Sequence, residues 1–294
     1  METFFTFLER RVDDCSSLLC IGLDPQAPDL KAPTADAALD FCLDIVKQTA
    51  RYAAAFKPNA AFFEVFGAEG WTALKQTIEA VQEQSNRLGS MIPVILDAKR
   101  SDIASTAEAY AKSAFQNLGA HCITLNPYLG KDSIEPFLQY PERGVFLLCK
   151  TSNPDAGDLQ DLVVTIDNRL QTVDEKPLSI AHGPSSMPLY EYIAYLAQSW
   201  NTRNNIGLVV GATHPETLAR VREIAPKLWF LAPGVGAQGG ELELALKAGL
   251  RKDGKGILIS VSRSIARAEK PGLAAAEFRD QILNIKRDLN RQAR

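Results

Sequence analysis

Eight short apolar runs recur along the 294-residue chain, and each run ends at a polar residue, a glycine or a proline. They are rich in valine, isoleucine and leucine and lack a regular polar alternation, which is typical of parallel strands buried on both faces. Segments with the three-and-four apolar spacing of helices lie between them. The strands are expected at 18–23, 54–56, 91–96, 122–125, 145–149, 206–210, 228–232 and 257–261.

This alternation of strand and helix predicts an α/β fold, a closed (β/α)8 barrel of the TIM type, formed by a single domain over residues 1–294. An open, doubly wound sheet is the alternative, because the number of strands does not prove that a barrel closes. The helices are expected at 35–53, 70–88, 106–118, 132–138, 189–199, 215–225, 241–248 and 274–289.

One segment interrupts the alternation. Residues 154–188 follow the fifth strand and contain several glycines and prolines. A stretch of this length inside a compact domain is typical of a functional lid or of a solvated insertion. Because it leaves the barrel where a strand ends, we predict a lid over the mouth of the barrel.

Composition limits the classes of partner. The net charge of −3 argues against nucleic-acid binding, which usually requires a basic surface. No apolar run approaches the roughly 20 residues that span a membrane, and the amino-terminal residues do not resemble a signal peptide. The five cysteines are odd in number and include no CxxC pair, so we expect reduced, buried thiols and a cytoplasmic protein.

Charged residues follow the apolar runs where a barrel places its catalytic groups. Lys57 follows the second strand, and Asp97, Lys99 and Asp102 follow the third. If Asp97 and Lys99 are both extended, their side chains share one face. Alternating acids and lysines keep one another charged. A salt-bridge cluster at the surface is the alternative, but the position at strand ends favours a catalytic array.

Two further strand ends indicate a phosphate site. The glycine-rich segment 233–240 follows the seventh strand and precedes a helix, and Arg263 follows the eighth. Glycines let a backbone approach an anion, and arginine can hold a phosphate through two hydrogen bonds. The loops after these two strands often bind phosphate in such barrels. A structural turn beside a solvated arginine is the alternative.

Other chemistries have no support in the sequence. The three histidines lack the spacing of metal ligands, the cysteines lack a paired histidine signature, and there is no GxSxG motif. A metal site and a nucleophilic serine or cysteine are therefore not predicted.

The segment 96–106, LDAKRSDIAST, resembles the signature D-x-K-x-x-D-I-[G/P]-x-T of orotidine 5′-phosphate decarboxylases. Segments 56–59, 124–128, 150–154, 233–240 and 262–265 are similar to the longer bacterial branch of that family. Ala104 departs from the signature, which has glycine or proline there. A positive φ at this position would cost an alanine about 1 kcal/mol and shift the loop slightly.

The resemblance implies a homodimer that converts orotidine 5′-monophosphate to uridine 5′-monophosphate in de novo pyrimidine synthesis, without metal or organic cofactor. It implies that Asp102 and Thr106 serve the partner's site. The matching catalytic residues are Lys57, Asp97, Lys99 and Asp102, and the matching substrate-binding residues are Asp24 for the ribose, Ser152 for the pyrimidine ring, Gln238 and Arg263 for the phosphate, and Thr106.

Loss of CO₂ would leave a carbanion at C6, and Lys99 is expected to stabilise it and to donate a proton. Three alternatives remain. A related sugar-phosphate enzyme shares the D-x-K-x-x-D pattern but uses magnesium. An aldolase would form a Schiff base on Lys57 or Lys99. A phosphate-binding module would bind a nucleotide without turnover, although it would not need four charged residues.

Overall fold

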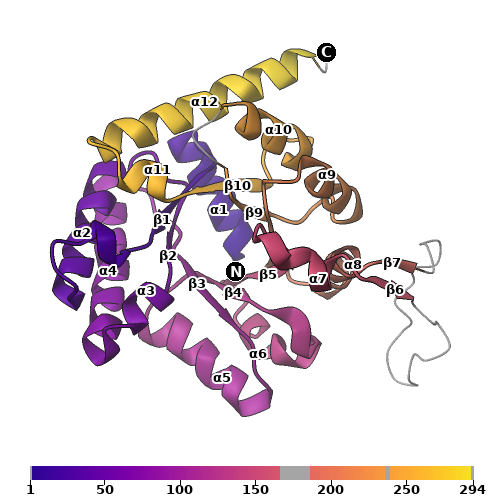
Figure 1. Cartoon of the computed structure of the whole chain (residues 1–294), viewed down its shortest axis with the longest axis horizontal. Helices are drawn as coiled ribbons and strands as arrows, with labels where there is room; N and C mark the ends of the chain where they lie inside the picture. Colours follow the sequence, from indigo (N-terminus) through magenta and orange to yellow (C-terminus); the bar gives the residue numbers. More distant parts are fainter. Residues whose placement is uncertain (1, 166–185, 236–238, 293–294) are drawn as a thin grey trace.

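The computed structural model describes residues 2–165, 186–235 and 239–292. Eight parallel strands form one sheet in the order β2-β1-β10-β9-β8-β5-β4-β3. Two isolated bridges, Phe56 with Val94 and Asn59 with Asp97, join β2 to β3, so the sheet curls into a barrel (Figure 1). The predicted closed barrel is confirmed, and the alternative of an open, doubly wound sheet is wrong. The strands are β1 (Leu19–Leu23), β2 (Ala55–Pro58), β3 (Ile95–Arg100), β4 (Cys122–Leu125), β5 (Gly144–Lys150), β8 (Ile206–Val210), β9 (Phe230–Pro233) and β10 (Ile257–Val261).

Helices surround the barrel, as Figure 1 shows, and cover the outer faces of the strands. Every expected helix is present, with ends shifted by a few residues. The segment expected at 106–118 forms α5 and then a π-helical turn at Ser113–Asn117. The helices around the barrel are α2 (Ala35–Thr49), α3 (Ala61–Glu64), α4 (Gly67–Leu88), α5 (Ala104–Lys112), α6 (Glu135–Leu138), α8 (Leu189–Trp200), α9 (Pro215–Ile224), α10 (Gly239–Gly249), α11 (Arg263–Ala266) and α12 (Pro271–Gln292).

The amino-terminal helix α1 (Phe4–Cys15) covers the end of the barrel at which the strands begin. Its Phe5 ring packs edge-on against Phe146 at 5.5 Å and stacks on Trp229 at 6.4 Å. Glu9 accepts a hydrogen bond from the Trp229 indole at 3.2 Å. This end is closed by aromatic packing, so the opposite end is the one available for a ligand.

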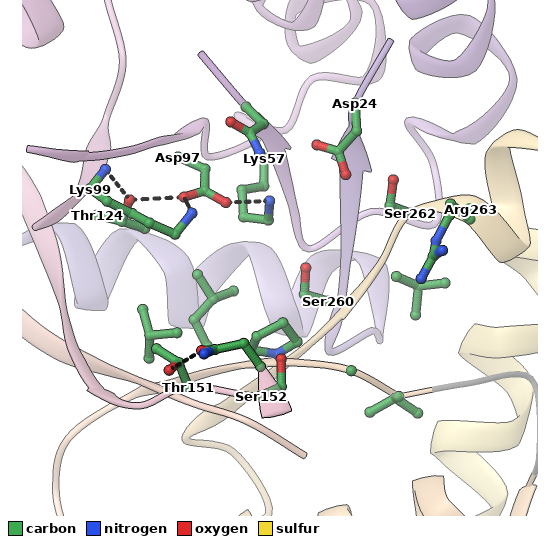
Figure 2. Close-up of a pocket in the computed structure, with 18 of the residues that line it drawn as sticks. Asp24, Lys57, Asp97, Lys99, Thr124, Thr151, Ser152, Ser260, Ser262 and Arg263 are labelled. Atoms are coloured by element: carbon green, nitrogen blue, oxygen red, sulfur yellow. Dashed lines mark hydrogen bonds and ion pairs between the residues drawn. The ribbon is translucent and has the colours of Figure 1, made fainter. Parts of the chain in front are cut away.

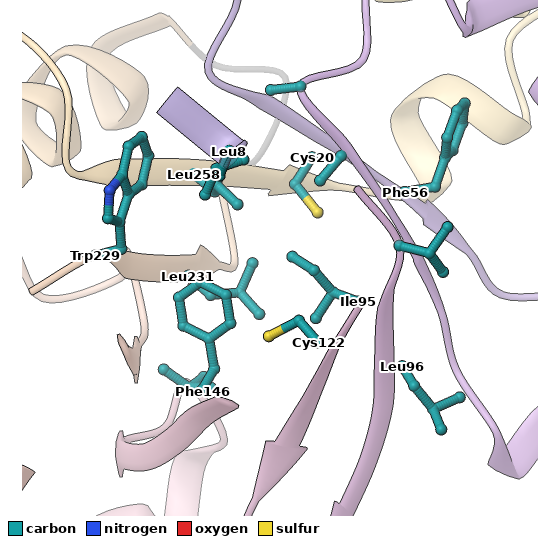
Figure 3. Packing of buried hydrophobic residues seen from close by; sticks show 14 of the residues in the cluster. Leu8, Cys20, Phe56, Ile95, Leu96, Cys122, Phe146, Trp229, Leu231 and Leu258 are labelled. Carbon is teal, nitrogen blue, oxygen red and sulfur yellow. The ribbon is translucent and has the colours of Figure 1, made fainter. Parts of the chain in front are cut away.

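Most of the barrel interior is apolar. Figure 3 shows Cys20, Ile95, Cys122 and Leu231 gathered inside the barrel, between strands from opposite walls. All four side chains are almost fully buried. All five cysteines are free and buried, so the expected burial of the thiols is confirmed. None of the described helices has the length and apolarity that a membrane span requires.

The insertion after β5 has more local structure than expected. It begins with a 3₁₀ turn (Pro154–Ala156) and α7 (Gly157–Gln160), and its two ends pair as the antiparallel strands β6 (Val163–Thr165) and β7 (Ser186–Pro188). Figure 1 shows this pair projecting from the barrel wall. The rest of the insertion lies outside the described residues, and its role as a lid stays a prediction.

Candidate active site

A pocket of about 570 Å³ opens at the end of the barrel where the strands terminate. Every barrel strand contributes to its wall, either directly or through the residues that follow it. Lys57, Asp97 and Lys99 stand on one side, and Figure 2 shows Ser152 and Arg263 on the other sides of the same space. The pocket therefore brings together six of the nine residues predicted from the sequence, the sixth being Asp24.

The centre of the pocket is an ion-pair array around Asp97. Lys57 Nζ donates to Asp97 Oδ2 at 2.8 Å, and Lys99 Nζ donates to Asp97 Oδ1 at 2.6 Å. Lys57 and Asp97 are buried, whereas the Lys99 side chain is 50% exposed to the pocket. The array thus has two fixed charges and one charge that a ligand can reach.

Mutual attraction keeps the two buried groups charged. Burial disfavours the ammonium of Lys57, but the negative charges of Asp97 and Asp24 outweigh it and hold the pKa of Lys57 above its ordinary value. Burial also disfavours the Asp97 carboxylate, yet Lys57 and Lys99 together hold the pKa of Asp97 well below its usual range. A charged carboxylate therefore faces the pocket at neutral pH.

The backbone at Lys99 is not the extended strand that the sequence suggested. Asp97 and Lys99 do point into the same pocket, but Lys99 has a φ of +48°, in the left-handed region. The pairing between β3 and β4 shifts register between Leu96 and Arg100. A β-bulge therefore directs the Lys99 side chain, in the way that bulges often re-aim residues beside active sites.

Asp24 follows β1 and lines the pocket beside Lys57. Its Oδ1 atom is buried and has no hydrogen-bond partner among the described residues, so it remains available to a ligand. The chain can pass here only because residue 22 is glycine. A Cβ on Gly22 would lie 2.7 Å from the Cβ of Ser262 and 3.1 Å from Asp24 Oδ2.

Ser152 and Arg263 lie on the remaining walls of the pocket. Ser152 follows β5 and Arg263 opens α11 after β10, and both side chains are exposed. Gln238, the predicted partner of Arg263 at the phosphate, lies outside the described residues. The structure therefore contains one half of the predicted phosphate clamp.

Asp102 and Thr106 do not line the pocket of their own chain. The Asp102 carboxylate accepts the N–H of Ile103 at 2.8 Å, and Thr106 is exposed on the first turn of α5. Ala104, at the start of that helix, has a φ of +38°, so its backbone has the positive φ that is unfavourable for alanine. The loop still forms and leads directly into α5.

Thr124 is a site residue that the sequence reasoning missed. It lines the pocket from β4, is 1% exposed, and bonds to Asp97. A polar residue within the apolar run 122–125 was the available signal. Among the described residues, no group of three or more His, Cys, Asp or Glu side chains is arranged to hold a metal ion.

The chain is similar to known proteins of one enzyme family. Residues 17–278 match the family described as "Orotidine 5'-phosphate decarboxylase / HUMPS family". Orotidine 5'-phosphate decarboxylases from Roseiflexus castenholzii and Thermomicrobium roseum are each 43% identical to the chain, and each alignment covers 97% of the relative and at least 97% of this chain. The structure of Leishmania donovani OMP decarboxylase superimposes with a TM-score of 0.80 at 49% identity, covering 97% of this chain and 99% of that one. The chain belongs to the orotidine 5′-phosphate decarboxylase / HUMPS family.

Proposed function

We propose that this protein decarboxylates orotidine 5′-monophosphate to uridine 5′-monophosphate, in pyrimidine biosynthesis. The observation that carries the proposal is the Lys57–Asp97–Lys99 array, which places a buried carboxylate and a reachable ammonium in one pocket. Relatives that are 43–45% identical over most of the chain are named for this activity.

The reaction requires stabilisation of charge at one carbon atom. The bond from C6 to the carboxylate breaks, CO₂ leaves, and the electron pair stays on C6. Lys99 stabilises this pair electrostatically and then transfers an Nζ proton to C6, after which solvent reprotonates the amine. The 50% exposure of its side chain makes Lys99 the member of the array that can reach the substrate.

Asp97 orients the proton donor. Its Oδ1 holds Lys99 Nζ at 2.6 Å, and its Oδ2 is neutralised by Lys57 at 2.8 Å. Because Asp97 is already paired on both oxygens, the array is organised before the substrate binds, and little reorganisation is needed during the reaction.

The remaining pocket residues fit the rest of the nucleotide. Asp24 has an unpartnered carboxylate oxygen, which accepts a hydrogen bond from a ribose hydroxyl, and Ser152 binds the pyrimidine ring. Arg263, together with Gln238, binds the phosphate, which is remote from the bond that breaks. Binding energy from the phosphate can then hold the reacting carbon against Lys99.

We also propose a homodimer with shared active sites. Asp102 and Thr106 lie outside their own pocket, on a part of the surface rich in exposed large apolar side chains. Ile103 belongs to the same loop, and Tyr128 and Leu129 follow the neighbouring strand β4. A second subunit on this surface would bury them and receive Asp102 and Thr106 in its site.

The competing chemistries are less well supported. A Schiff base requires a neutral amine, but the pKa of Lys57 is raised by its carboxylate partners although burial opposes this. The family description also names the HUMPS family, whereas the relatives from Roseiflexus castenholzii and Verminephrobacter eiseniae, aligned over more than 90% of this chain, carry the decarboxylase name. We place the enzyme in the cytoplasm, because five free thiols suit a reducing compartment.

The test is the loss of orotidylate absorbance with purified protein in excess EDTA, with identification of uridine 5′-monophosphate as the product. Turnover that persists in EDTA supports the proposal. Turnover that needs added magnesium contradicts the metal-free mechanism, and a covalent adduct trapped by borohydride contradicts the role of Lys99. Tight nucleotide binding without any product would indicate a binding module.

A further inference from the structure

The strand pair beside the proton donor is irregular. Leu96 pairs with Ile123, and the next pairing joins Arg100 to Leu125. Three residues of β3, at positions 97 to 99, therefore stand opposite the single residue Thr124 of β4. Such a bulge removes ladder hydrogen bonds from the longer side, and the freed N–H groups need other acceptors.

The Thr124 hydroxyl group supplies the hydrogen-bond acceptor that the irregular pairing of β3 with β4 lacks. Thr124 Oγ1 accepts the N–H of Ala98 at 3.1 Å and the N–H of Lys99 at 3.0 Å. The same oxygen donates to Asp97 Oδ1 at 3.0 Å. One donor and two acceptors are the full capacity of a hydroxyl group, so all of it is used here. Figure 2 shows Thr124 between the Lys99 backbone and the Asp97 carboxylate.

The backbone that this hydroxyl holds is strained. Lys99 has a φ of +48°, which is unfavourable for a residue with a long side chain. Such a conformation persists only where its surroundings fix it, and the Lys99 N–H bond to Thr124 is one of those constraints. Thr124 also holds the carboxylate oxygen to which Lys99 Nζ is bound. Thr124 therefore holds the Lys99 backbone directly and the Lys99 ammonium through Asp97.

We propose that Thr124 is a positioning residue for the decarboxylation, which acts through Asp97 and Lys99 and not through contact with the reacting atoms. The proposal rests on the proposed function of the pocket. Its physical content is that the hydroxyl, and not the shape of the side chain, sets the direction of Lys99 Nζ. Valine has the shape of threonine without the hydroxyl, whereas serine keeps the hydroxyl without the methyl group.

The experiment compares Thr124→Val with Thr124→Ser. Each variant is assayed for kcat and KM with orotidine 5′-monophosphate, and its affinity for uridine 5′-monophosphate is measured by calorimetry. For Thr124→Val we expect kcat to fall about 10²-fold, the size of effect that a displacement of about 1 Å at a catalytic group produces. Nucleotide affinity should stay within about threefold, because the phosphate and ribose contacts are untouched. Thr124→Ser should keep kcat within about threefold of the unaltered protein, because its hydroxyl can make all three bonds.

The matched control is Thr49→Val. Thr49 is also fully buried, and its hydroxyl also makes a hydrogen bond, to the Ile45 carbonyl at 2.7 Å, but within α2 and away from the pocket. It should leave kcat unchanged. Thr124→Cys, with a weaker hydrogen-bonding group of similar size, provides a second variant if the valine protein does not fold, and should give an intermediate kcat.

Three results would overturn the proposal: an unchanged kcat in Thr124→Val, an equal loss in the serine and valine variants, or a loss of nucleotide affinity that parallels the loss of kcat. These results differ from a failure of the proposed function. In that case the unaltered protein itself would not consume orotidine 5′-monophosphate.

Discussion

Gln160 and Thr151 form a reciprocal pair of hydrogen bonds. Gln160 Oε1 accepts the N–H of Thr151 at 2.9 Å, and Gln160 Nε2 donates to the Thr151 hydroxyl at 2.8 Å. That hydroxyl donates in turn to Asn153 Oδ1 at 2.6 Å. Lys150 at the end of β5 adds an ion pair with Asp161 at 2.6 Å. The start of the insertion is therefore fastened to the segment that carries Ser152.

Gln160→Ala tests this link. Loss of two hydrogen bonds should loosen the segment 151–153 and weaken recognition of the pyrimidine ring, with KM for orotidine 5′-monophosphate rising about tenfold, as expected for a loss of about 1.4 kcal/mol. We expect kcat to change less, because Lys99 is held by other contacts. The affinity for uridine 5′-monophosphate should fall more than the affinity for ribose 5-phosphate, which has no ring to recognise.

The control for this variant is Gln116→Ala. Gln116 is exposed, and its amide donates to Tyr140 on the outer surface of the barrel at 3.1 Å. Its removal should leave KM unchanged. Equal losses of affinity for both ligands in Gln160→Ala would show that Gln160 does not act through the ring-binding segment.

The shared-site proposal predicts complementation between two inactive variants. Lys99→Ala lacks the proton donor, and Asp102→Ala lacks the residue that we assign to the partner's site. Each alone should lose nearly all turnover, while Lys99→Ala keeps nucleotide binding. In a hybrid dimer one site would have both native residues, so random subunit exchange should restore about a quarter of the native activity.

A second mixture controls for non-specific rescue. Lys57 and Lys99 bind the same Asp97 within one chain, so Lys57→Ala and Lys99→Ala cannot complement each other through a dimer. Activity is measured after subunit exchange has been demonstrated with labelled chains. An absence of recovery in the Lys99 and Asp102 mixture would contradict the shared site.

The sequence predicted the elements that depend on local pattern. The eight strands were identifiable because each is a continuous apolar run, and the buried strands β1, β8 and β10 have no exposed residue. The charges at 57, 97 and 99 were recognisable as a cluster because parallel strands end at one side of a barrel. Family resemblance then supplied roles for them.

The parts that could not be predicted depend on strand pairing between distant segments. The bulge at Lys99 arises where β3 is paired with β4, and no property of the segment 97–99 alone reveals it. Thr124 looks like an ordinary β-branched strand residue until its neighbour across the sheet is known. Gln160 likewise gains its role from a contact with Thr151, which precedes the insertion.

Protonation of His121 is predicted to destabilise the fold at acidic pH. Its Nδ1 accepts the N–H of Val94 at 3.2 Å, and burial, assisted by the positive charge of Arg143, lowers the pKa of His121 to about 4. The unfolded chain binds this proton near pH 6.5, so the unfolded state holds more protons between these two values. The contribution of neutral His121 to the free energy of unfolding is therefore complete above about pH 6.5. It is lost as the pH falls toward 4, and the total loss is about 3 kcal/mol.

Urea unfolding at a series of pH values between about 4 and 7 measures this effect. The control is His121→Asn, whose amide oxygen can accept the same N–H but does not titrate. The variant should show a flatter dependence of the unfolding free energy on pH than the unaltered protein. Parallel curves for the two proteins would show that His121 makes no contribution to acid sensitivity.

Arg222 is predicted to stabilise the end of the barrel opposite the pocket. Its guanidinium donates to four backbone carbonyl groups, two in the loop between α9 and β9, one at the last residue of α10 and one just before β10. It lies 3.6 Å from the centre of the Phe230 ring. These acceptors are the carbonyl oxygens of Ala225, Leu228, Gly249 and Gly256. Arg222→Ala leaves all four without this donor and should lower the free energy of unfolding by about 3 kcal/mol, with Arg222→Lys intermediate.

Because the pocket lies at the other end of the barrel from Arg222, kcat of the folded fraction of Arg222→Ala should not change. Urea unfolding and steady-state assays on the same samples measure the two quantities, and a parallel loss of kcat and stability would mean that the two ends of the barrel are coupled.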